Sequence, residues 1–516
     1  MLTFTQVIIK INETNQQYFN YMKKLSLALL LLCAAITGTA QINRPKLVVG
    51  LMVDQMRWDY LYYYYDSFGE GGLKRIVDTG FSFEDTKINY IPTITAVGHS
   101  SVYTGSVPAL HGIAGNGFAV DNKQVYCCAD DNVKPIGTTS SAGKMSPHYL
   151  VASTIGDELK LATDFKAKVI GVAMKDRAAI LPAGHSADAA YWYDNSVGHF
   201  VTSSFYMDKF PAWVEKFNAA NATTPGKDVK STPDGVTLTF KMAQAAIENE
   251  NLGADNITDL LAISISSTDI ISHATGTRGK ENKEVFMRLD HDLAQFLAYL
   301  DKKIGKDNYL LFLTADHGGI HNPNYTLSHR IPSGGCDQAG IGKALNAHLQ
   351  KAFNSQANMV VGIADSRLYL NHPEIEKAGL NLQAIKDTAV NFLRRDKEIA
   401  FAVDYEKAYV TSVPAPIREQ IVNGYNNKRS GDIVLINYPR VLPYAINADY
   451  RGTSHGSWVP DDARIPFVLM GWNVGHGSCN APTRIVDIAP TVCSMLHIQM
   501  PDACIGNSVL DKVTKK

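Results

Sequence analysis

The sequence predicts an α/β fold in which a mostly parallel central sheet is flanked by helices and carries insertion segments. Short apolar runs, typical of buried strands, alternate along the chain with stretches of helical periodicity. Acidic and imidazole side chains follow directly after several of these runs, and functional groups of open α/β sheets gather beyond the carboxyl ends of strands. These patterns favour one large catalytic domain with insertions.

Six apolar runs are predicted to be strands: 46–53, 166–174, 260–266, 309–315, 433–437 and 466–470. Two segments show helical spacing of apolar residues, an amphipathic helix over 280–301 and a shorter one over 483–496 near the C-terminus. Glycine-rich and polar stretches are predicted to be loops or insertions over the sheet: 183–208, 318–342 and 423–432.

Composition describes an ordinary globular protein. Of its 516 residues, 45% are hydrophobic and 19% are charged, and the formal net charge is -1. A nearly neutral chain lacks the basic excess that nucleic-acid binding requires, so we expect no nucleic-acid-binding module. Any attraction for anions must therefore be local.

The N-terminus has the composition of an export signal running from Met22 to Ala40. Two lysines precede an apolar stretch over 25–35, and small residues follow at 38–40. We therefore expect residues 1–40 to be an extension plus signal peptide, and 41–516 to be one catalytic domain. No later stretch is apolar enough to span a bilayer stably, so a periplasmic or secreted protein is expected.

Six carboxylate and imidazole side chains follow the predicted elements: Asp54, Asp269, His273, Asp316, His317 and His455. The spacing of four between Asp269 and His273 places both on one helical face. Asp316 and His317 are adjacent, so the chain must turn there for both to face one site, and the two following glycines allow it. Three carboxylates and three imidazoles suit two divalent ions of the zinc type, because magnesium prefers oxygen alone.

Each of these residues has an ordinary explanation when taken alone. An aspartate at a strand end is more often a helix cap or a turn residue than a ligand. His273 alone could be a buried histidine of the core, and His455 alone could belong to a surface loop. The metal centre is predicted by the clusters together.

A candidate nucleophile, Thr95, lies in Pro92-Thr-Ile-Thr-Ala-Val-Gly-His99 at the predicted start of a helix. Backbone N–H groups and the helix dipole favour negative charge at that position. From the residues alone, Thr93 could serve as well. Two divalent ions beside an activated hydroxyl predict hydrolysis of a phosphoryl-type substrate.

Lys175 and Arg177 follow the predicted strand 166–174. If the segment stays extended there, residues two apart project to the same face and both cations can reach one phosphoryl group. A phosphate monoester offers them a dianion, whereas a diester replaces one charged oxygen with a second organic group. The pair would then favour monoesters. Taken alone, a Lys-Asp-Arg triplet is more often an exposed turn without a binding role.

As an ordered set, these motifs resemble the alkaline phosphatase superfamily, and within it the PafA-type phosphate-irrepressible alkaline phosphatases of bacteria. The resemblance spans essentially the whole mature chain. The motifs that carry it are Val53-Asp54-Gln-Met-Arg57, Pro92-Thr-Ile-Thr-Ala-Val-Gly-His99, His111-Gly-Ile-Ala-Gly-Asn116, Lys175-Asp-Arg177, Ser267-Thr-Asp-Ile-Ile-Ser-His273, Thr314-Ala-Asp-His-Gly-Gly319 and Ser454-His-Gly456.

The resemblance implies an alkaline-phosphatase-like core and an exported phosphomonoesterase acting on small phosphate monoesters. It implies two Zn²⁺ ions, one held by Asp269, His273 and His455, the other by Asp54, Asp316 and His317. It also implies that Thr95, rather than Thr93, forms a covalent phosphothreonine. Asn116, Lys175 and Arg177 would contact the transferred phosphoryl group.

Two alternatives remain at this point. Nucleotide pyrophosphatases and phosphodiesterases of the same superfamily share the metal ligands, the threonine and the asparagine, but lack the Lys/Arg pair. An inert metal- or phosphate-binding receptor is an alternative from a different class. Comparing a monoester with a matched diester separates the two enzymes, and Thr95→Ala separates an enzyme from a receptor.

Overall fold

The computed structural model describes residues 3–36, 43–120 and 123–513, which form two compact units, Met1–Asn43 and Arg44–Lys516. The first unit contains helix α1 (Phe4–Ile36). The small residues expected at the signal cleavage site, 38–40, lie outside the described residues. Across the described ranges, we find no helix with a stretch both long and apolar enough to cross a membrane.

The second unit is built on a ten-stranded sheet in the order β20-β2-β19-β11-β1-β10-β7-β8-β9-β6. Its middle strands run parallel: β11 (Tyr309–Thr314), β1 (Leu47–Val53), β10 (Asp259–Ile265), β7 (Val169–Ala173) and β8 (Ala189–Asp194). The outer strands join by antiparallel pairing: β19 (Phe467–Gly471) and β2 (Phe81–Phe83) on one side, β9 (His199–Ser203) and β6 (Pro135–Ile136) on the other. The edge strand β20 (Gly477–Cys479) runs parallel to β2. The predicted mostly parallel sheet is confirmed.

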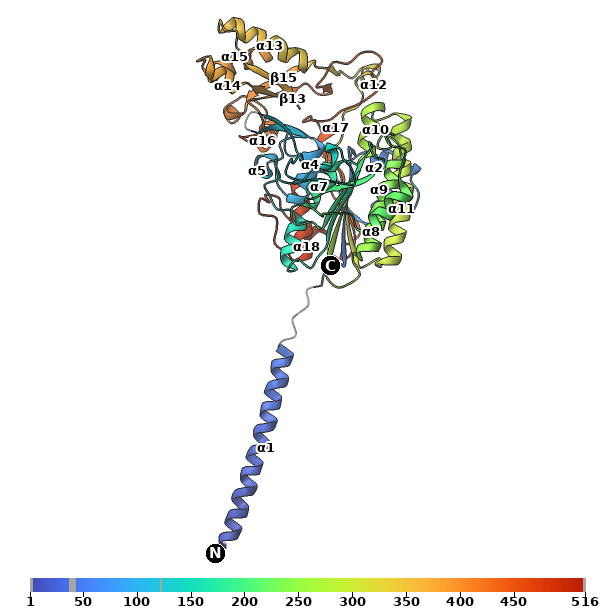
Figure 1. Cartoon of the computed structure of the whole chain (residues 1–516), viewed down its shortest axis with the longest axis vertical. Helices are drawn as coiled ribbons and strands as arrows, with labels where there is room; N and C mark the ends of the chain where they lie inside the picture. The colour runs from blue at the N-terminus through green and yellow to red at the C-terminus, as the bar shows by residue number, and fades with distance from the viewer. Residues whose placement is uncertain (1–2, 37–42, 121–122, 514–516) are drawn as a thin grey trace. The chain divides into compact units, whose positions relative to one another are not determined.

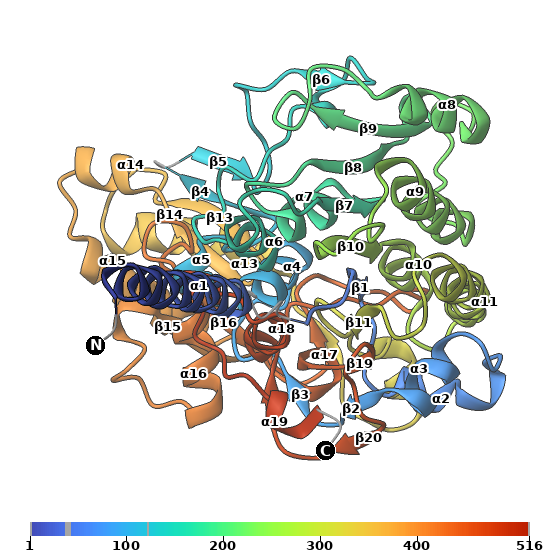
Figure 2. The ribbon, with the colours of Figure 1, turned by 90° about the horizontal axis from the view of Figure 1, so that it is seen from below.

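Helices cover both faces of this sheet (Figure 2). One face carries α4 (Thr95–Thr104), α6 (Ile155–Ala162), α7 (Asp176–Ala183) and α18 (Ile488–Leu496), and the other carries α8 (Ala212–Asn221), α9 (Asp234–Glu250) and α11 (Lys280–Lys303). Every residue of β1 is buried, as expected for a strand covered on both sides. The predicted helix over 280–301 is confirmed by α11, and within the predicted helix over 483–496 a 3₁₀ turn at Ile485–Asp487 leads into α18.

A second, four-stranded sheet has the order β13-β14-β16-β15. Its strands are β13 (Val360–Ala364), β14 (Arg367–Leu370), β16 (Ile433–Asn437) and β15 (Ile399–Asp404). It carries α13 (Gln338–Ala352), α14 (His372–Lys377), α15 (Leu382–Leu393) and α16 (Ala415–Gly424). We call these elements the cap. They lie beyond one end of the central sheet, on the side where α10 (Ser267–Thr275) leaves β10 (Figure 1).

One predicted strand lies outside the central sheet, and one predicted loop is wrong. The run 433–437 is a strand, but it pairs within the cap and not within the central sheet, because an apolar run does not specify its partner strand. The stretch 183–208 was expected to be a loop, yet it forms β8 and β9 at the edge of the central sheet. Its short strands are separated by a tight turn rich in polar residues, which hides their pattern.

The remaining elements are short. The helices are α2 (Tyr60–Tyr63), α3 (Leu73–Thr79), α5 (Pro108–His111), α12 (Pro323–Ser328), α17 (Pro460–Ala463) and α19 (Leu510–Val513). The strands are β4 (Gly117–Val120) with β5 (Lys123–Tyr126), β12 (Gly334–Gly335) with β17 (Val441–Leu442), and β3 (Thr86–Lys87) between β18 (Arg464–Ile465) and β21 (Thr483–Arg484).

Candidate active site

Three neighbouring parallel strands deliver the carboxylates of the site. Asp54 follows β1, Asp269 lies in the first turn of the helix after β10, and Asp316 follows β11. Because β1 pairs with both other strands, their carboxyl ends meet at the same edge of the sheet. Chain segments far apart in sequence thus contribute to one acidic cluster.

The structure brings all six sequence-predicted ligands together. The donor atoms of Asp269, His273 and His455 lie within 4.8 Å of one another, and so do those of Asp54, Asp269 and His317. Asp316 Oδ2 lies 3.4 Å from His317 Nε2, which joins the sixth ligand to the second group. Asp269 therefore stands between the two groups, whereas the resemblance assigned it to the first alone.

Each of the three imidazoles is oriented by a backbone carbonyl. The Nδ1 atoms contact the carbonyl oxygens of other residues at short range: His273 with Thr453 at 2.9 Å, His317 with Gly318 at 2.9 Å, and His455 with Thr93 at 2.7 Å. A carbonyl only accepts, so Nδ1 carries the proton and Nε2 keeps its lone pair. All three rings therefore present Nε2 to the carboxylate cluster, as metal-binding histidines do.

The cluster also contains buried polar atoms without a hydrogen-bond partner among the described residues: Asp54 Oδ1, Asp269 Oδ1, Asp316 Oδ2 and His317 Nε2. An unpaired buried oxygen is costly, and several in one place favour a bound cation. Burial and the Asp316 carboxylate raise the pKa of Asp54 well above its ordinary value. The mixture of oxygen and nitrogen donors fits divalent ions of the zinc type.

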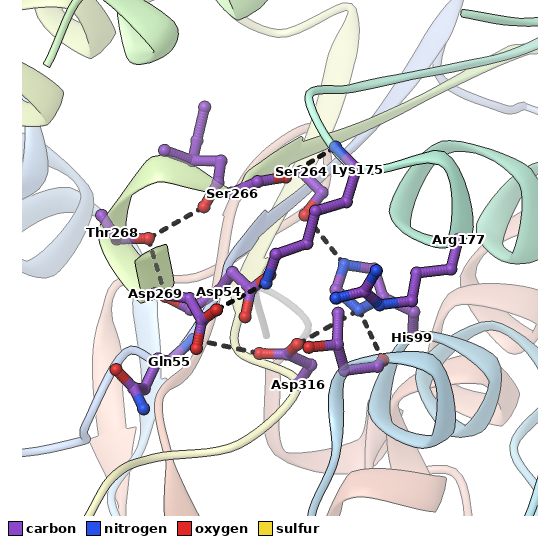
Figure 3. A network of polar contacts seen from close by, with 12 residues as sticks. Asp54, Gln55, His99, Lys175, Arg177, Ser264, Ser266, Thr268, Asp269 and Asp316 are labelled. Atoms are coloured by element: carbon purple, nitrogen blue, oxygen red, sulfur yellow. Dashed lines mark hydrogen bonds and ion pairs between the residues drawn. The ribbon is translucent and has the colours of Figure 1, made fainter. Parts of the chain in front are cut away.

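Lys175 lies between two of the carboxylates. Its Nζ donates to Asp54 Oδ2 and to Asp269 Oδ2, both at 2.6 Å (Figure 3). Burial alone lowers the pKa of Lys175, but these two carboxylates raise it overall. A buried ammonium ion thus neutralises part of the negative charge of the cluster.

Arg177 does not follow the geometry that the sequence suggested. Strand β7 ends at Ala173 and helix α7 begins at Asp176, so the segment does not stay extended through Arg177. Asp176 in the first helical turn favours that helix start. Arg177 instead reaches toward the cluster from its helix (Figure 3), and its guanidinium donates to the Tyr126 hydroxyl at 3.0 Å.

Thr95 is the first residue of α4, as predicted. A Cβ added to Gly98, one turn later, would lie 2.2 Å from the backbone oxygen of Asp316, so only glycine lets the helix approach the carboxylate cluster this closely. Asn116 Oδ1 accepts from the Ala96 N–H at 3.1 Å, which leaves the Asn116 amide N–H groups beside the helix N-terminus. Thr95 Oγ1 makes no hydrogen bond within the described residues.

Thr93 has a different environment. Its hydroxyl donates to Asp462 Oδ2 at 2.8 Å and accepts from the Gly456 N–H at 3.0 Å, next to His455. These bonds hold the loop that carries His455, so Thr93 has a structural role. Sequence reasoning missed Asp462, which is fully buried, because it follows no predicted strand or recognisable motif.

His99 supports the site from behind. Its Nδ1 lies 2.8 Å from the Thr95 carbonyl oxygen and 3.3 Å from Asp316 Oδ2, and its Nε2 lies 2.8 Å from Ser264 Oγ. The ring therefore links α4 to Asp316 and to β10.

The chain is similar to proteins of one enzyme family. The model of the family described as type I phosphodiesterase / nucleotide pyrophosphatase matches residues 48–458. A protein named calcium-transporting ATPase from Myroides odoratus is 42% identical, over 93% of this chain and 96% of that one. Alkaline phosphatase PafA from Elizabethkingia meningoseptica is 39% identical, over 92% and 96%. The crystal structure of wild-type alkaline phosphatase PafA matches with a TM-score of 0.88 at 39% identity, over 92% of this chain and 100% of that one.

Proposed function

We propose a mechanism for this chain on the premise that it belongs to the type I phosphodiesterase / nucleotide pyrophosphatase family of the alkaline phosphatase superfamily and is an alkaline phosphatase. In this mechanism it hydrolyses phosphate monoesters to an alcohol and inorganic phosphate through a phosphothreonine at Thr95. The observation that carries the proposal is the convergence of six carboxylate and imidazole side chains beside the N-terminus of α4. The three carboxylates and His317 are buried, whereas His273 and His455 are partly buried.

The two ligand groups would hold two zinc ions, one at Asp269, His273 and His455, the other at Asp54, Asp316 and His317. Their orphaned donor atoms and oriented imidazoles fit such ions. When bound, zinc supplies positive charge that lowers the pKa of a nearby hydroxyl and stabilises oxyanions. This explains how an ordinary threonine hydroxyl can act as a nucleophile.

Thr95 Oγ1 attacks phosphorus, the bond from phosphorus to the leaving-group oxygen breaks, and a phosphothreonine forms. A water molecule then attacks the same phosphorus and releases inorganic phosphate and the free hydroxyl. The N-terminal N–H groups of α4 and the amide of Asn116 stabilise the negative phosphoryl oxygens. Little general acid–base catalysis by side chains is needed.

Lys175 and Arg177 would neutralise the two further phosphoryl oxygens of a monoester dianion. Lys175 pairs with Asp54 and Asp269, which would also hold the proposed ions. With those carboxylates bound to metal, the ammonium group would be available to substrate. Arg177 would reach the phosphoryl group from the first turn of α7. This pair is the proposed basis of selectivity for monoesters.

The test compares a phosphate monoester with a matched methyl diester, using residues 41–516. The matching family is described as type I phosphodiesterase / nucleotide pyrophosphatase, so a phosphodiesterase is the second candidate function. A strong preference for the diester would reject the monoesterase proposal. The double variant Lys175→Ala/Arg177→Ala should lose far more kcat/KM for the monoester than for the diester. Equal losses would refute the role of the pair.

We also propose that the protein is exported, with residues 22–40 as its signal. The mature chain should then begin near Gln41 and reach the periplasm or medium. N-terminal sequencing of the protein from each fraction tests this, and an intact N-terminus on cytoplasmic protein alone would contradict it.

A further inference from the structure

A cavity of about 380 Å³ lies between the active site and the cap. Ile94, Asn116 and His455 line it on the active-site side, next to Thr95. Its other wall includes the cap residues Gln338, Ile363 and Ser366 and the neighbouring Tyr444. A substrate with its phosphorus at Thr95 would place its organic group in this space.

Two carboxylates line the cavity, those of Asp337 and Asp365, while none of its lining residues is a lysine or an arginine. The distribution of charge is therefore one-sided. Lys175 and Arg177, the cations of the site, are absent from this lining. The phosphoryl group of a substrate would face the positive charges of Lys175 and Arg177, and its organic group would face the negative charges of Asp337 and Asp365.

Asp365 is held at the tip of the hairpin between β13 and β14. Asp365 and Ser366 both adopt left-handed backbone conformations, with φ of 50° and 58°, and aspartate tolerates this conformation better than most residues. A Cβ on Gly115 would lie 2.9 Å from Asp365 Oδ2, so the tip docks against the loop that carries Asn116. The side chain of Asp365 remains 32% exposed.

Arg367 pairs with Asp365 from outside the cavity, and Arg177 also attracts this carboxylate. Its NH2 group lies 3.2 Å from Asp365 Oδ2, and its NH1 group donates to the Ala114 carbonyl oxygen at 2.6 Å. The Arg367 side chain is fully buried and does not line the cavity. A ligand in the cavity thus meets the carboxylate and not the guanidinium group.

Asp337 is the N-cap of α13, where its Oδ1 accepts from the Gly340 N–H at 2.9 Å. The residue is exposed, and the helix dipole stabilises its negative charge. Asparagine also caps helices well and tolerates left-handed backbone, so Asp→Asn changes at 337 and 365 remove charge while keeping both local structures.

We propose that this cavity is the leaving-group subsite and that Asp337 and Asp365 select leaving groups by charge. Alcohols that are neutral or carry an ammonium group are accepted, and alcohols that carry a carboxylate or a second phosphate are repelled. Like charges in a partly desolvated cavity repel more strongly than in water, which gives discrimination without any new contact. The inference deepens the proposed function and rests on it.

The experiment uses three monoesters with two-carbon leaving groups of different charge: 2-aminoethyl phosphate, 2-hydroxyethyl phosphate and carboxymethyl phosphate. kcat/KM is measured for the wild type, for Asp337→Asn, for Asp365→Asn and for the double variant. In the double variant the ratio of the anionic to the neutral substrate should rise about three- to tenfold, and the ratio of the cationic to the neutral substrate should fall. Added salt should shrink the wild-type discrimination.

The control is Asp387→Asn, an isosteric change in α15 of the cap at an acid that pairs with Lys407 outside the cavity. It should leave both ratios unchanged. Ratios within one variant do not depend on how much of the enzyme is folded. Unchanged ratios in the double variant, with normal monoester turnover, would overturn the inference alone, whereas a wild type that hydrolyses none of the three monoesters would overturn the proposed function and this inference with it.

Discussion

At the scale of the residue, two threonines of one motif, Thr93 and Thr95, have different surroundings. Thr95 begins α4 and has an uncommitted hydroxyl, whereas the Thr93 hydroxyl is bonded to Asp462 and to the loop of His455. The sequence alone left either one open as the nucleophile. The hydrogen bonds favour Thr95 for the proposed role, because the Thr93 hydroxyl already donates to the buried Asp462 carboxylate.

This difference predicts opposite phenotypes. Thr95→Ala should lower kcat about a thousandfold or more with an unchanged unfolding free energy, because only the nucleophile is lost. Thr93→Ala should instead lower the unfolding free energy by about 1–3 kcal/mol, because Asp462 loses a buried donor. Steady-state kinetics and urea unfolding of both variants check this. A Thr95→Ala enzyme with near-normal turnover would contradict the assignment.

Lys175 makes a prediction about the metal-free protein. Removing this ammonium leaves Asp54 and Asp269 buried without a counter-charge, so Lys175→Gln should destabilise the chelator-treated protein by about 3–5 kcal/mol. Zinc restores the missing charge, and the loss should shrink when metal is added. Lys160→Gln, which breaks the pair of the buried Lys160 with the exposed carboxylate of Asp188, is the control and should cost the same with or without zinc. Metal-independent destabilisation of Lys175→Gln would contradict the account.

His111 predicts a pH dependence of stability. Its Nδ1 accepts from the Ile113 N–H and its Nε2 faces Ser101 Oγ, so the buried ring is neutral, and burial lowers its pKa to about 3. The unfolded chain, with a pKa near 6.5, binds this proton first. Stability from His111 is thus complete above pH 6.5 and is lost as pH falls, by about 2 kcal/mol between pH 7 and pH 5.

Urea unfolding of the wild type and of His111→Gln at both pH values measures this contribution. The two proteins should differ less at pH 5 than at pH 7 by that amount. A difference that does not change with pH would show that the ring is not held neutral.

At the scale of the element, the position of α4 decides whether Thr95 reaches the ligands. Gly98 sets the distance between this helix and the backbone of Asp316. Gly98→Ala should displace the helix, cost about 1–3 kcal/mol of stability and reduce activity strongly. Gly362→Ala, in β13, has nothing within 4 Å of the added Cβ and should change neither property. Urea unfolding and steady-state kinetics of the Gly98→Ala and Gly362→Ala variants test this role of the helix. Normal activity of Gly98→Ala would refute it.

Some helices and strands could be predicted from the sequence, and others could not. Buried strands and the donors at their ends could be predicted, because apolar runs followed by Asp or His carry a local signal, as after β1 and β11. The start of α7 at Asp176, which changes the direction of Arg177, could not be predicted. A sequence pattern does not locate the end of a strand to within two residues. The separate pairing of β16 is a non-local choice that no short pattern encodes.

At the scale of the whole molecule, the site combines two parts of the second unit. Strand ends of the central sheet, helices α4 and α10 and the loop of His455 supply Thr95 and the six predicted ligands, and the cap supplies the acidic wall of the cavity. The ligand clusters could be predicted to converge because parallel strands share one edge. The cavity could not, because its wall comes from the tip of a cap hairpin whose docking against Gly115 is visible only in three dimensions.

The most direct test of the central claim is a crystal structure of the zinc-loaded protein with anomalous diffraction collected at the zinc edge. The account predicts two zinc peaks, one among Asp269, His273 and His455 and one among Asp54, Asp316 and His317, with Thr95 Oγ1 beside them. A single peak, peaks elsewhere, or a Thr95 hydroxyl turned away from both positions would contradict it.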